Sequence, residues 1–543
     1  MDRGLGLVAE PAGVGSGSMP GGLSAKDLEE WAAALAGLDG ADLGAAELVD
    51  LLATLERAKA SCAAAQAKVT AAFVAAEAHV ADHWRHRAQE CLDASDFEGY
   101  CAAKDSIRRH EFAPVPLNGR PHERESSRGS RRGAHEKAGI AAQVGLARHE
   151  SPHRGARLAT TAVALVEDLP HTLEALTTGQ LNERRAELVA RLTSHLSRDQ
   201  RLAVDAEAVG ANLADPAADV PAGIATWGDR RLEATVRAVA DRIDAEAAVA
   251  RARTAESERR VTLRPIPDTM AVVTAVLPVA QAVALYAALT AAAATAQAGG
   301  DPRGKGQVMA DTLVDRVLCS AVGSGADEAG PALPSLPPDI PVEVQVVITD
   351  RALLEGDETP AHIPGYGPVP AGWARELLTR DLGPPPADAS GGSPPARARR
   401  WLRRLYTHPA TGNLVALDSK RRLFPAGLRR FLIARDGVCR TPWCDAPIRH
   451  ADHVEPWAGG GSTSAGNGQG LCVRCNHVKE QPGWRHRVDR GVAGPGLHEV
   501  VLTTPTGHHH TSVAPPVLPG QRNLVSGETA SPLEAWLIDR LAG

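Results

Sequence analysis

Apolar residues recur at helical spacing over most of the first half of the chain. Leu28, Trp31 and Leu35 fall three and four residues apart, and the same period continues to about residue 108. After a polar stretch, helical periodicity returns from about 138 to 260. The pattern predicts a long helical domain over residues 25–320.

The hydrophobic pattern changes where charged residues stop. No charge occurs between Asp268 and Asp301, and the stretch predicts a strand at about 269–277 and an alanine-rich helix at about 279–297. Its length invites comparison with a membrane span, but Pro278 and the interspersed Thr and Gln residues favour a strand followed by a helix outside any membrane. We therefore expect no membrane partner.

Other segments lack either period. Residues 1–24 are rich in Gly and predict a flexible lead, and the polar, basic residues at 112–136 predict a disordered insert. Residues 320–340 and 381–398 are rich in Pro, Gly, Ser and Ala, which is typical of linkers. Between them, the alternation in PVEVQVVITD predicts a strand at 341–350.

The last third of the chain predicts short, mixed elements. We expect a hairpin at 404–417, a helix at 425–435 that Gly437 ends, a second hairpin after Trp484 and a closing helix at 532–541. The predicted fold is therefore mainly α, with a small α+β part near the C-terminus. The corresponding divisions are a connector at 321–400, a compact module at 401–490 and a C-terminal hairpin and helix at 491–543.

Charge is distributed unevenly along the 543 residues. The chain has a net charge of −6, yet residues 397–440 carry 12 basic residues against two acidic ones, a net of +10. A basic block in an acidic chain favours a polyanionic partner such as DNA over a merely solvated face. Guanidinium groups suit phosphate contacts, and six arginines are the candidates: Arg403, Arg404, Arg421, Arg422, Arg429 and Arg430.

Four of the eight cysteines form two close pairs in the same region. Cys439 and Cys444 are separated by four residues, and Cys472 and Cys475 by two. Four thiolates at such spacing close a tetrahedral structural zinc site. No apolar secretory segment is evident near residue 1, so we expect a reducing, cytoplasmic environment in which a metal site is favoured over disulfides.

The residues between the cysteine pairs resemble the HNH, or ββα-metal, endonuclease motif in its zinc-stabilised form. The similarity covers roughly residues 426–484 and rests on Asp452-His453, the glycines that follow, Asn467, and Cys475-Asn476-His477. The resemblance implies that Asp452 binds a divalent cation, that His453 is the general base, and that Asn467 supports the loop carrying the base. Asn476 matches the third position, a second cation ligand.

Two assignments in this motif remain open. His477 follows Asn476 directly and is the alternative ligand; neighbouring helical residues point about 100° apart, so only one of the two should face the cation. His450 precedes His453 by three residues and either faces the same site or caps a loop. Oxygen ligands favour Mg²⁺ or Mn²⁺ at this position, while the thiolates favour zinc.

The remainder of the chain is similar to actinobacterial HNH-signature proteins that carry a long N-terminal helical domain of unknown function. The phrases that carry this resemblance include LPHTLEALTTGQLNERRAELV at 169–189 and DPRGKGQVMADTLVDRV at 301–317. It implies a metal-dependent DNA endonuclease. Two alternatives stay open: a zinc-dependent DNA-binding protein without catalysis, and a nuclease directed at RNA.

Overall fold

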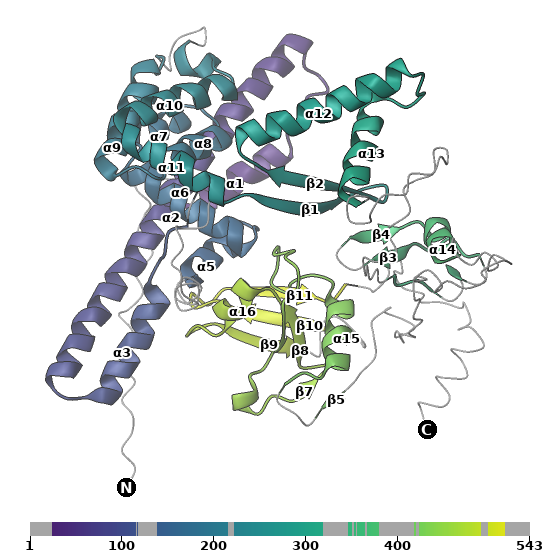
Figure 1. Cartoon of the computed structure of the whole chain (residues 1–543). Helices are drawn as coiled ribbons and strands as arrows, with labels where there is room; N and C mark the ends of the chain where they lie inside the picture. The colour runs from purple at the N-terminus through teal and green to yellow at the C-terminus, as the bar shows by residue number, and fades with distance from the viewer. Residues whose placement is uncertain are drawn as a thin grey trace, which may run out of the picture.

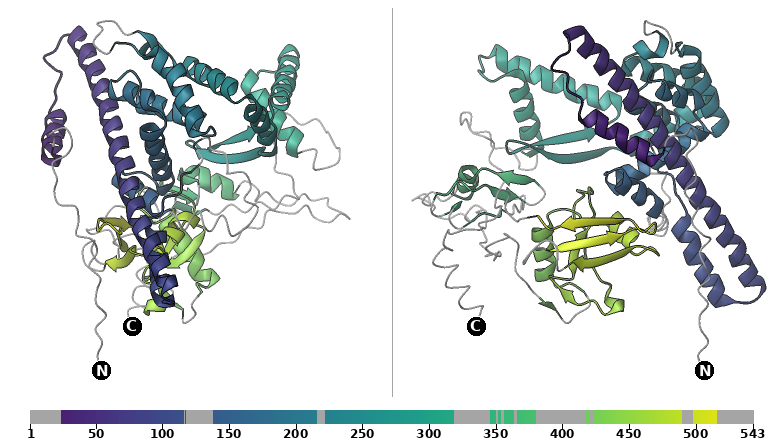
Figure 2. Two further views of the ribbon diagram at one scale, coloured as in Figure 1. Left: turned by 90° about the vertical axis from the view of Figure 1, so that its left-hand side faces the viewer. Right: turned by 180° about the vertical axis from the view of Figure 1, so that it is seen from behind.

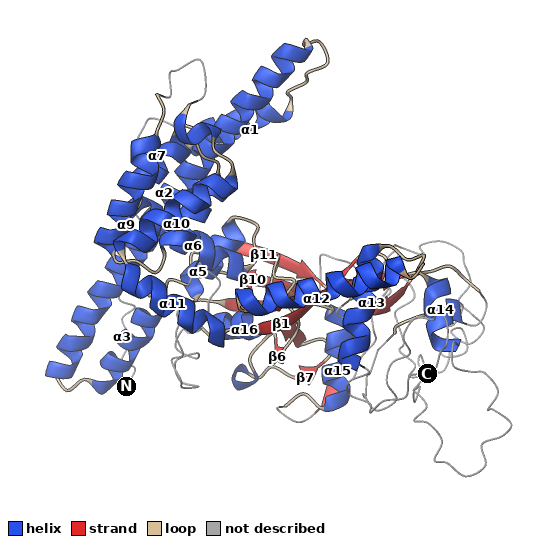
Figure 3. Ribbon diagram, turned by 45° about the horizontal axis from the view of Figure 1, so that its top comes forward, coloured by secondary structure: helices blue, strands red, loops and turns tan. Residues whose placement is uncertain are grey.

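The computed structural model is mostly helical, with small sheets toward the C-terminus (Figures 1 and 3). This confirms the predicted fold class at that level. The structure describes the following residues: 24–115, 117, 138–215, 222–318, 346–349, 352–353, 356–363, 366–379, 418–419, 423–489 and 498–515. The predicted lead, most of the basic insert, the hairpin at 404–417 and the closing helix lie outside them.

The N-terminal helices include one very long helix. α1 (Ala25–Ala36) begins at Ser24, whose hydroxyl accepts a hydrogen bond from the Asp27 amide; α2 (Ala45–Asp93) follows, and α3 (Phe97–His110) folds back on it. Figure 2 shows the α2–α3 hairpin projecting from the rest of the helices. The middle of α2 buries mainly alanines, which lets neighbouring helices approach its backbone closely.

The main hydrophobic core lies among helices that pack on α2 and on one another. These are α6 (Pro152–Glu167), α7 (Pro170–Thr177), α8 (Glu183–Thr193), α9 (Arg198–Val204) and α10 (Asp229–Ile243). Short π and 3₁₀ turns join them: η1 (Asp205–Val209), η2 (Gly210–Asn212) and η3 (Gly223–Thr226). Their apolar stripes meet in one cluster that includes Leu169, Val189 and Leu232. These helices agree with the helical periodicity of the sequence between residues 138 and 260.

Residues 245–318, here called the arm, follow the helical core. α11 (Ala245–Ser257) leads into an antiparallel hairpin of β1 (Arg260–Ile266) and β2 (Met270–Val276). α12 (Val279–Ala298) and α13 (Lys305–Leu318) then pack against each other. β2 and α12 agree with the predicted strand and helix, whereas β1 was not predicted. Of the described helices, α12 alone is long and apolar enough, by length and composition, to cross a membrane.

A small unit follows the arm in the sequence and precedes the C-terminal module. It contains β3 (Ala361–Ile363) paired with β4 (Gly367–Val369), and α14 (Ala371–Thr379). The predicted strand at 341–350 is described only at residues 346–349, where Val347 forms a bridge with His362. Tyr366 donates a hydrogen bond of 2.7 Å to the carbonyl oxygen of Ile266, which joins this unit to β1.

The C-terminal module comprises the described residues from 418 to 515. α15 (Ala426–Asp436) ends at Gly437, which has a φ of 66°, as the sequence predicts. Its strands are β5 (Asp418–Ser419) paired with β7 (Thr463–Ser464), β6 (His450–His453) paired with β8 (Gly468–Leu471), and a three-stranded sheet of β9 (Arg485–Asp489), β10 (Glu499–Thr503) and β11 (His509–Val513). η6 (Trp457–Gly459) lies between β6 and β7, and α16 (Val473–Lys479) follows β8.

α5 (Gly139–Ala147) connects the helical core to the C-terminal module (Figure 1). One of its faces packs Ile140 and Val144 against α2 and α6. The opposite face places Ala142 and Leu146 against Val478, Trp484 and Leu502 of the module. Eight of its nine residues are buried as a result, and this short helix packs on both the helical domain and the module.

Candidate metal centre and the adjoining polar site

The two cysteine pairs come together at one point in the C-terminal module. Cys439 and Cys444 lie in the loop after α15, Cys472 caps α16, and Cys475 is in its first turn. The four Sγ atoms all lie within 4.8 Å of one another. Sγ of Cys444 is 3.6 Å from that of Cys475 and 3.8 Å from that of Cys472. Four thiolates around zinc at 2.3 Å are about 3.8 Å apart. The cysteines therefore form a group that can bind a metal ion such as zinc.

The electrostatics of the four thiols also favour a cation. The nearby thiol of Cys439 lowers the pKa of Cys472, and that of Cys444 lowers the pKa of Cys439. The Cys439 thiol is also the main cause that raises the pKa of Cys444 and Cys475. Adjacent thiolates repel one another, so a full set of four requires a positive ion between them.

The loop that carries the first cysteine pair has an unusual backbone. Trp443 and Asp445, on either side of Cys444, have φ values of 59° and 45°. The amide of Cys439 donates to the carbonyl oxygen of Ala446, which closes the loop. The Trp443 ring at its tip stacks on His149 of the helical domain, with ring centroids 4.6 Å apart. This strained loop is thus fixed by its own hydrogen bonds and by a contact from outside the module.

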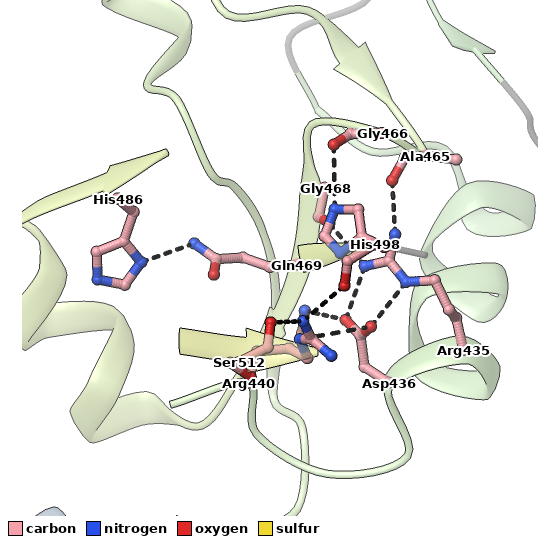
Figure 4. A network of polar contacts seen from close by, with 11 residues as sticks. Arg435, Asp436, Arg440, Ala465, Gly466, Gly468, Gln469, His486, His498 and Ser512 are labelled. Carbon is pink, nitrogen blue, oxygen red and sulfur yellow. Dashed lines mark hydrogen bonds and ion pairs between the residues drawn. The ribbon is translucent and has the colours of Figure 1, made fainter. Parts of the chain in front are cut away.

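A buried ion pair joins α15 to the strands beside the cysteines (Figure 4). Asp436 accepts hydrogen bonds from Arg435 Nε at 2.7 Å and from the amide of Gly470 at 2.7 Å. Arg435 also donates to the carbonyl oxygens of Ala465 and Gly468. Both side chains are almost wholly inaccessible. The network fixes the position of β8, and therefore of α16, relative to α15.

Arg440 extends the same network to the last sheet. Its Nη2 donates to the carbonyl oxygens of Ser512 and His498, at 2.6 Å and 3.1 Å. Burial lowers the pKa of Arg440 to about 10. The pKa of His498 is lowered to about 3 by burial and by the nearby charges of Arg435 and Arg440. Both arginines belong to the basic block by sequence, yet the structure buries them.

β6, β8 and α16 bring together the polar residues that the sequence singles out. Asp452 lies opposite Gln469 in the β6–β8 ladder, and its Oδ2 atom is 2.8 Å from Nζ of Lys479 on α16. Asn476 and Lys479 are three residues apart and share one face of the helix. Asn476 therefore lies on the same side of α16 as Lys479, the residue that contacts Asp452 on β6.

One buried oxygen on α16 accepts no hydrogen bond. Asn476 Oδ1 is inaccessible and has no partner among the described residues, whereas Asp452 Oδ2 is 2.8 Å from the Lys479 ammonium. Buried polar atoms are nearly always satisfied, so the Asn476 oxygen requires an explanation. A bound cation would satisfy it.

His453 lies next to Asp452 in sequence but on the other face of β6, because successive strand residues alternate. Its ring is buried against Phe424, with centroids 4.6 Å apart, and its Nε2 atom is 2.8 Å from Thr463 Oγ1. Trp457 lies on another side of the ring. The contacts fix the orientation of the imidazole at the end of the strand, beside the loop that follows.

Asn467 holds that loop closed. Its Nδ2 atom donates to the carbonyl oxygens of Glu455 and Ser462, and its Oδ1 accepts from the Glu455 amide. A side chain at Gly461 would collide with the Glu455 carbonyl oxygen, at 2.0 Å, so the close crossing requires glycine there. These bonds join the two ends of the loop from 454 to 467.

The remaining candidates are placed as follows. Burial, followed by the charge of His477, lowers the pKa of His450, so these two residues lie near each other at the β6–α16 junction. Arg429 and Arg430 are exposed on α15, and Arg429 donates to the Arg449 carbonyl oxygen. Arg403, Arg404, Arg421 and Arg422 lie outside the described residues.

Sequence reasoning gave no role to Lys479 and His486. Lys479 has a side chain only 4% exposed beside Asp452, and His486 is buried next to it, in contact with Gln469 at 3.4 Å. Burial and the Lys479 charge lower the pKa of His486 to about 3, which keeps that ring neutral. The available signal was the position of Lys479, one of only eight lysines in the chain, one turn after Asn476.

The fold and the site thus define a mainly helical protein with a C-terminal module that has a four-cysteine group able to bind a metal ion. Residues 122–381 match the model of a family described as a domain of unknown function, DUF222. The matched residues overlap the region expected to form a domain of unknown function, and they end before the C-terminal module begins. No curated protein and no solved structure matched the chain.

Proposed function

We propose that the C-terminal module is a metal-dependent endonuclease that hydrolyses phosphodiester bonds in DNA. The observation that carries the proposal is the buried Asn476 Oδ1 atom, which has no hydrogen-bond partner and lies on the same side of α16 as Lys479, the ion-pair partner of Asp452. Hard oxygen ligands of this kind suit Mg²⁺ or Mn²⁺. The zinc ligands Cys439, Cys444, Cys472 and Cys475 would have only a structural role.

Four residues of the module have a task in the proposed reaction. Asp452 and Asn476 would hold the cation, which supplies a positive charge for the phosphate and the leaving oxygen. His453 would take the proton of the attacking water, with its ring oriented by Thr463 and Phe424. Asn467 would keep the loop after His453 in place. Of these four residues, only Asn467 acts without touching substrate or cation.

The Asp452–Lys479 ion pair bears on this proposal in two ways. The ammonium orients the carboxylate toward α16, and it also competes with a divalent cation for the same oxygen. If the ion pair persisted, Asp452 would be unavailable as a ligand. That observation favours the alternative function, a zinc-dependent DNA-binding protein whose contacts include the exposed Arg429 and Arg430.

Plasmid nicking with purified full-length protein separates these functions. We expect cleavage that requires Mg²⁺ or Mn²⁺, and a loss of at least a hundredfold in the His453→Ala, Asp452→Ala and Asn476→Ala variants. His509→Ala is the matched control, because His509 is exposed on β11. DNA binding by the parent without metal-dependent cleavage would support the DNA-binding alternative. Cleavage confined to a single-stranded RNA substrate would support the RNA nuclease.

A further inference from the structure

The β1–β2 hairpin has one face made entirely of apolar residues. Strand alternation and the observed register place Val261, Leu263 and Pro265 of β1 on the same face as Ala271, Val273 and Ala275 of β2. The other face carries the polar residues, including Arg260, Thr262 and Arg264. An amphipathic sheet normally buries its apolar face. Here, however, Leu263 is 71% exposed and Val273 60% exposed.

The helix that follows the hairpin presents a second apolar surface. α12 has no charged residue, and of its 20 residues only Ala293 is buried. Val279, Val283 and Tyr286 are among its most exposed side chains, and an open groove runs along it between Ala282 and Ala294. A helix that is apolar on all sides is normally covered on all sides, whereas the observed packing partner of α12 is α13 on one side.

We propose that this surface, made of the apolar face of β1–β2 and the exposed side of α12, binds the same surface of a second copy of the chain. Half the surface of a helix of this length is about 500 Å², and one face of the hairpin adds about 250 Å². The sum is close to the roughly 800 Å² that each partner buries in a stable interface. The proposal does not depend on the nuclease function.

The chemistry of the surface favours a second copy over other occupants. Residues 269–300 contain no charge, so the surface offers nothing by which a charged partner would be selected, and an uncharged apolar surface is complementary to itself across a two-fold axis. A lipid bilayer fits less well: among the described strands the hairpin has no third strand, and open sheet edges are not tolerated in hydrocarbon. In a dimer those edges can pair.

Light scattering after gel filtration, repeated over a range of concentrations, tests the proposal on the full-length protein. We expect twice the chain mass of 56.8 kDa, and at least a tenfold weaker self-association for Leu263→Arg and Tyr286→Arg. Thr262→Arg is the matched control, because Thr262 is exposed on the opposite face of the same hairpin. Its dimer should be unchanged. Circular dichroism establishes that the variants keep the helical content of the parent.

Three results would overturn the proposal. The first is a parent that stays monomeric at every concentration. The second is a parent that dimerises while Leu263→Arg and Tyr286→Arg, still folded, dimerise equally well. The third is recovery of the parent, but not of Leu263→Arg, with vesicles of equal parts phosphatidylcholine and phosphatidylglycerol, which would assign the surface to a membrane.

Discussion

The Asp436 carboxylate neutralises the Arg435 guanidinium where water is excluded. Removing this carboxylate should therefore lower the stability of the C-terminal module strongly. In Asp436→Ala, the Arg435 guanidinium stays buried without its partner and the Gly470 amide loses its acceptor. Breaking a buried ion pair typically costs about 3–5 kcal/mol. We expect a loss of this order in chemical unfolding of the C-terminal module. Glu480→Ala, at an exposed position with ordinary backbone angles, is the control and should change stability much less.

His486 and His498 make the stability of the C-terminal module depend on pH. Both have a pKa of about 3 in the folded chain, against about 6.5 when unfolded. The unfolded chain therefore binds more protons between pH 6.5 and pH 3, and the folded state loses stability as pH falls through this range. Each histidine should contribute a slope of about 1.4 kcal/mol per pH unit.

Unfolding measured at several pH values on the single variants His486→Gln and His498→Gln tests this expectation. Each variant should have a shallower decline below pH 6.5 than the parent by the contribution of one histidine. His509→Gln, at an exposed position, should decline as the parent does. A parent and variants with the same slope would contradict the burial of these rings.

At the scale of elements, the cysteine group decides whether α16 and the loop after α15 stay together. The apolar cluster around this loop consists mostly of the cysteines themselves, so the metal should supply much of the stability of the loop and of the first turn of α16. We expect one zinc ion per chain by elemental analysis. Cys475→Ser should lose the metal and unfold the module, as reported by the fluorescence of Trp484. Cys101→Ser, exposed on α3, should retain both.

Spacing in the sequence was sufficient to predict the elements whose pattern is local. The uncharged stretch between Asp268 and Asp301 predicts β2 and α12. The spacing of the paired cysteines predicts the four-cysteine group. Arg435 shows the limit of such reasoning: it has the same side chain as Arg429 and Arg430, but six residues along a helix amount to a rotation of about 240°. That rotation turns Arg435 into the core. The carbonyl oxygens of Ala465 and Gly468 that accept from Arg435, and the partner of Lys479, lie in segments distant in sequence.

At the scale of the whole molecule, α5 makes the helical domain part of the module's own core. Ala142 and Leu146 cover Trp484 and Val478 from a position more than 300 residues earlier in the chain. Gln143 strengthens the contact, since its Oε1 accepts a hydrogen bond of 2.8 Å from Thr506. The sequence of either segment alone does not predict this contact, because each segment has only the apolar pattern of an ordinary helix or strand. The position of Asp452 and Asn476 relative to the helical domain therefore depends on α5.

Ala142→Arg should separate the two parts of the molecule without unfolding the helical core. Ala142 is 1% exposed and faces the module, so an arginine there has no room and no partner charge, whereas Ile140 and Val144 on the other face of α5 keep their contacts. We expect faster hydrogen exchange in β10, which carries Leu502, and a red-shifted emission from Trp484 as it meets water. Exchange in α8 and α10 should not change. Ala147→Arg, at the exposed end of the same helix, should behave as the parent does; equal exchange in β10 for both variants would mean that the module does not rest on α5.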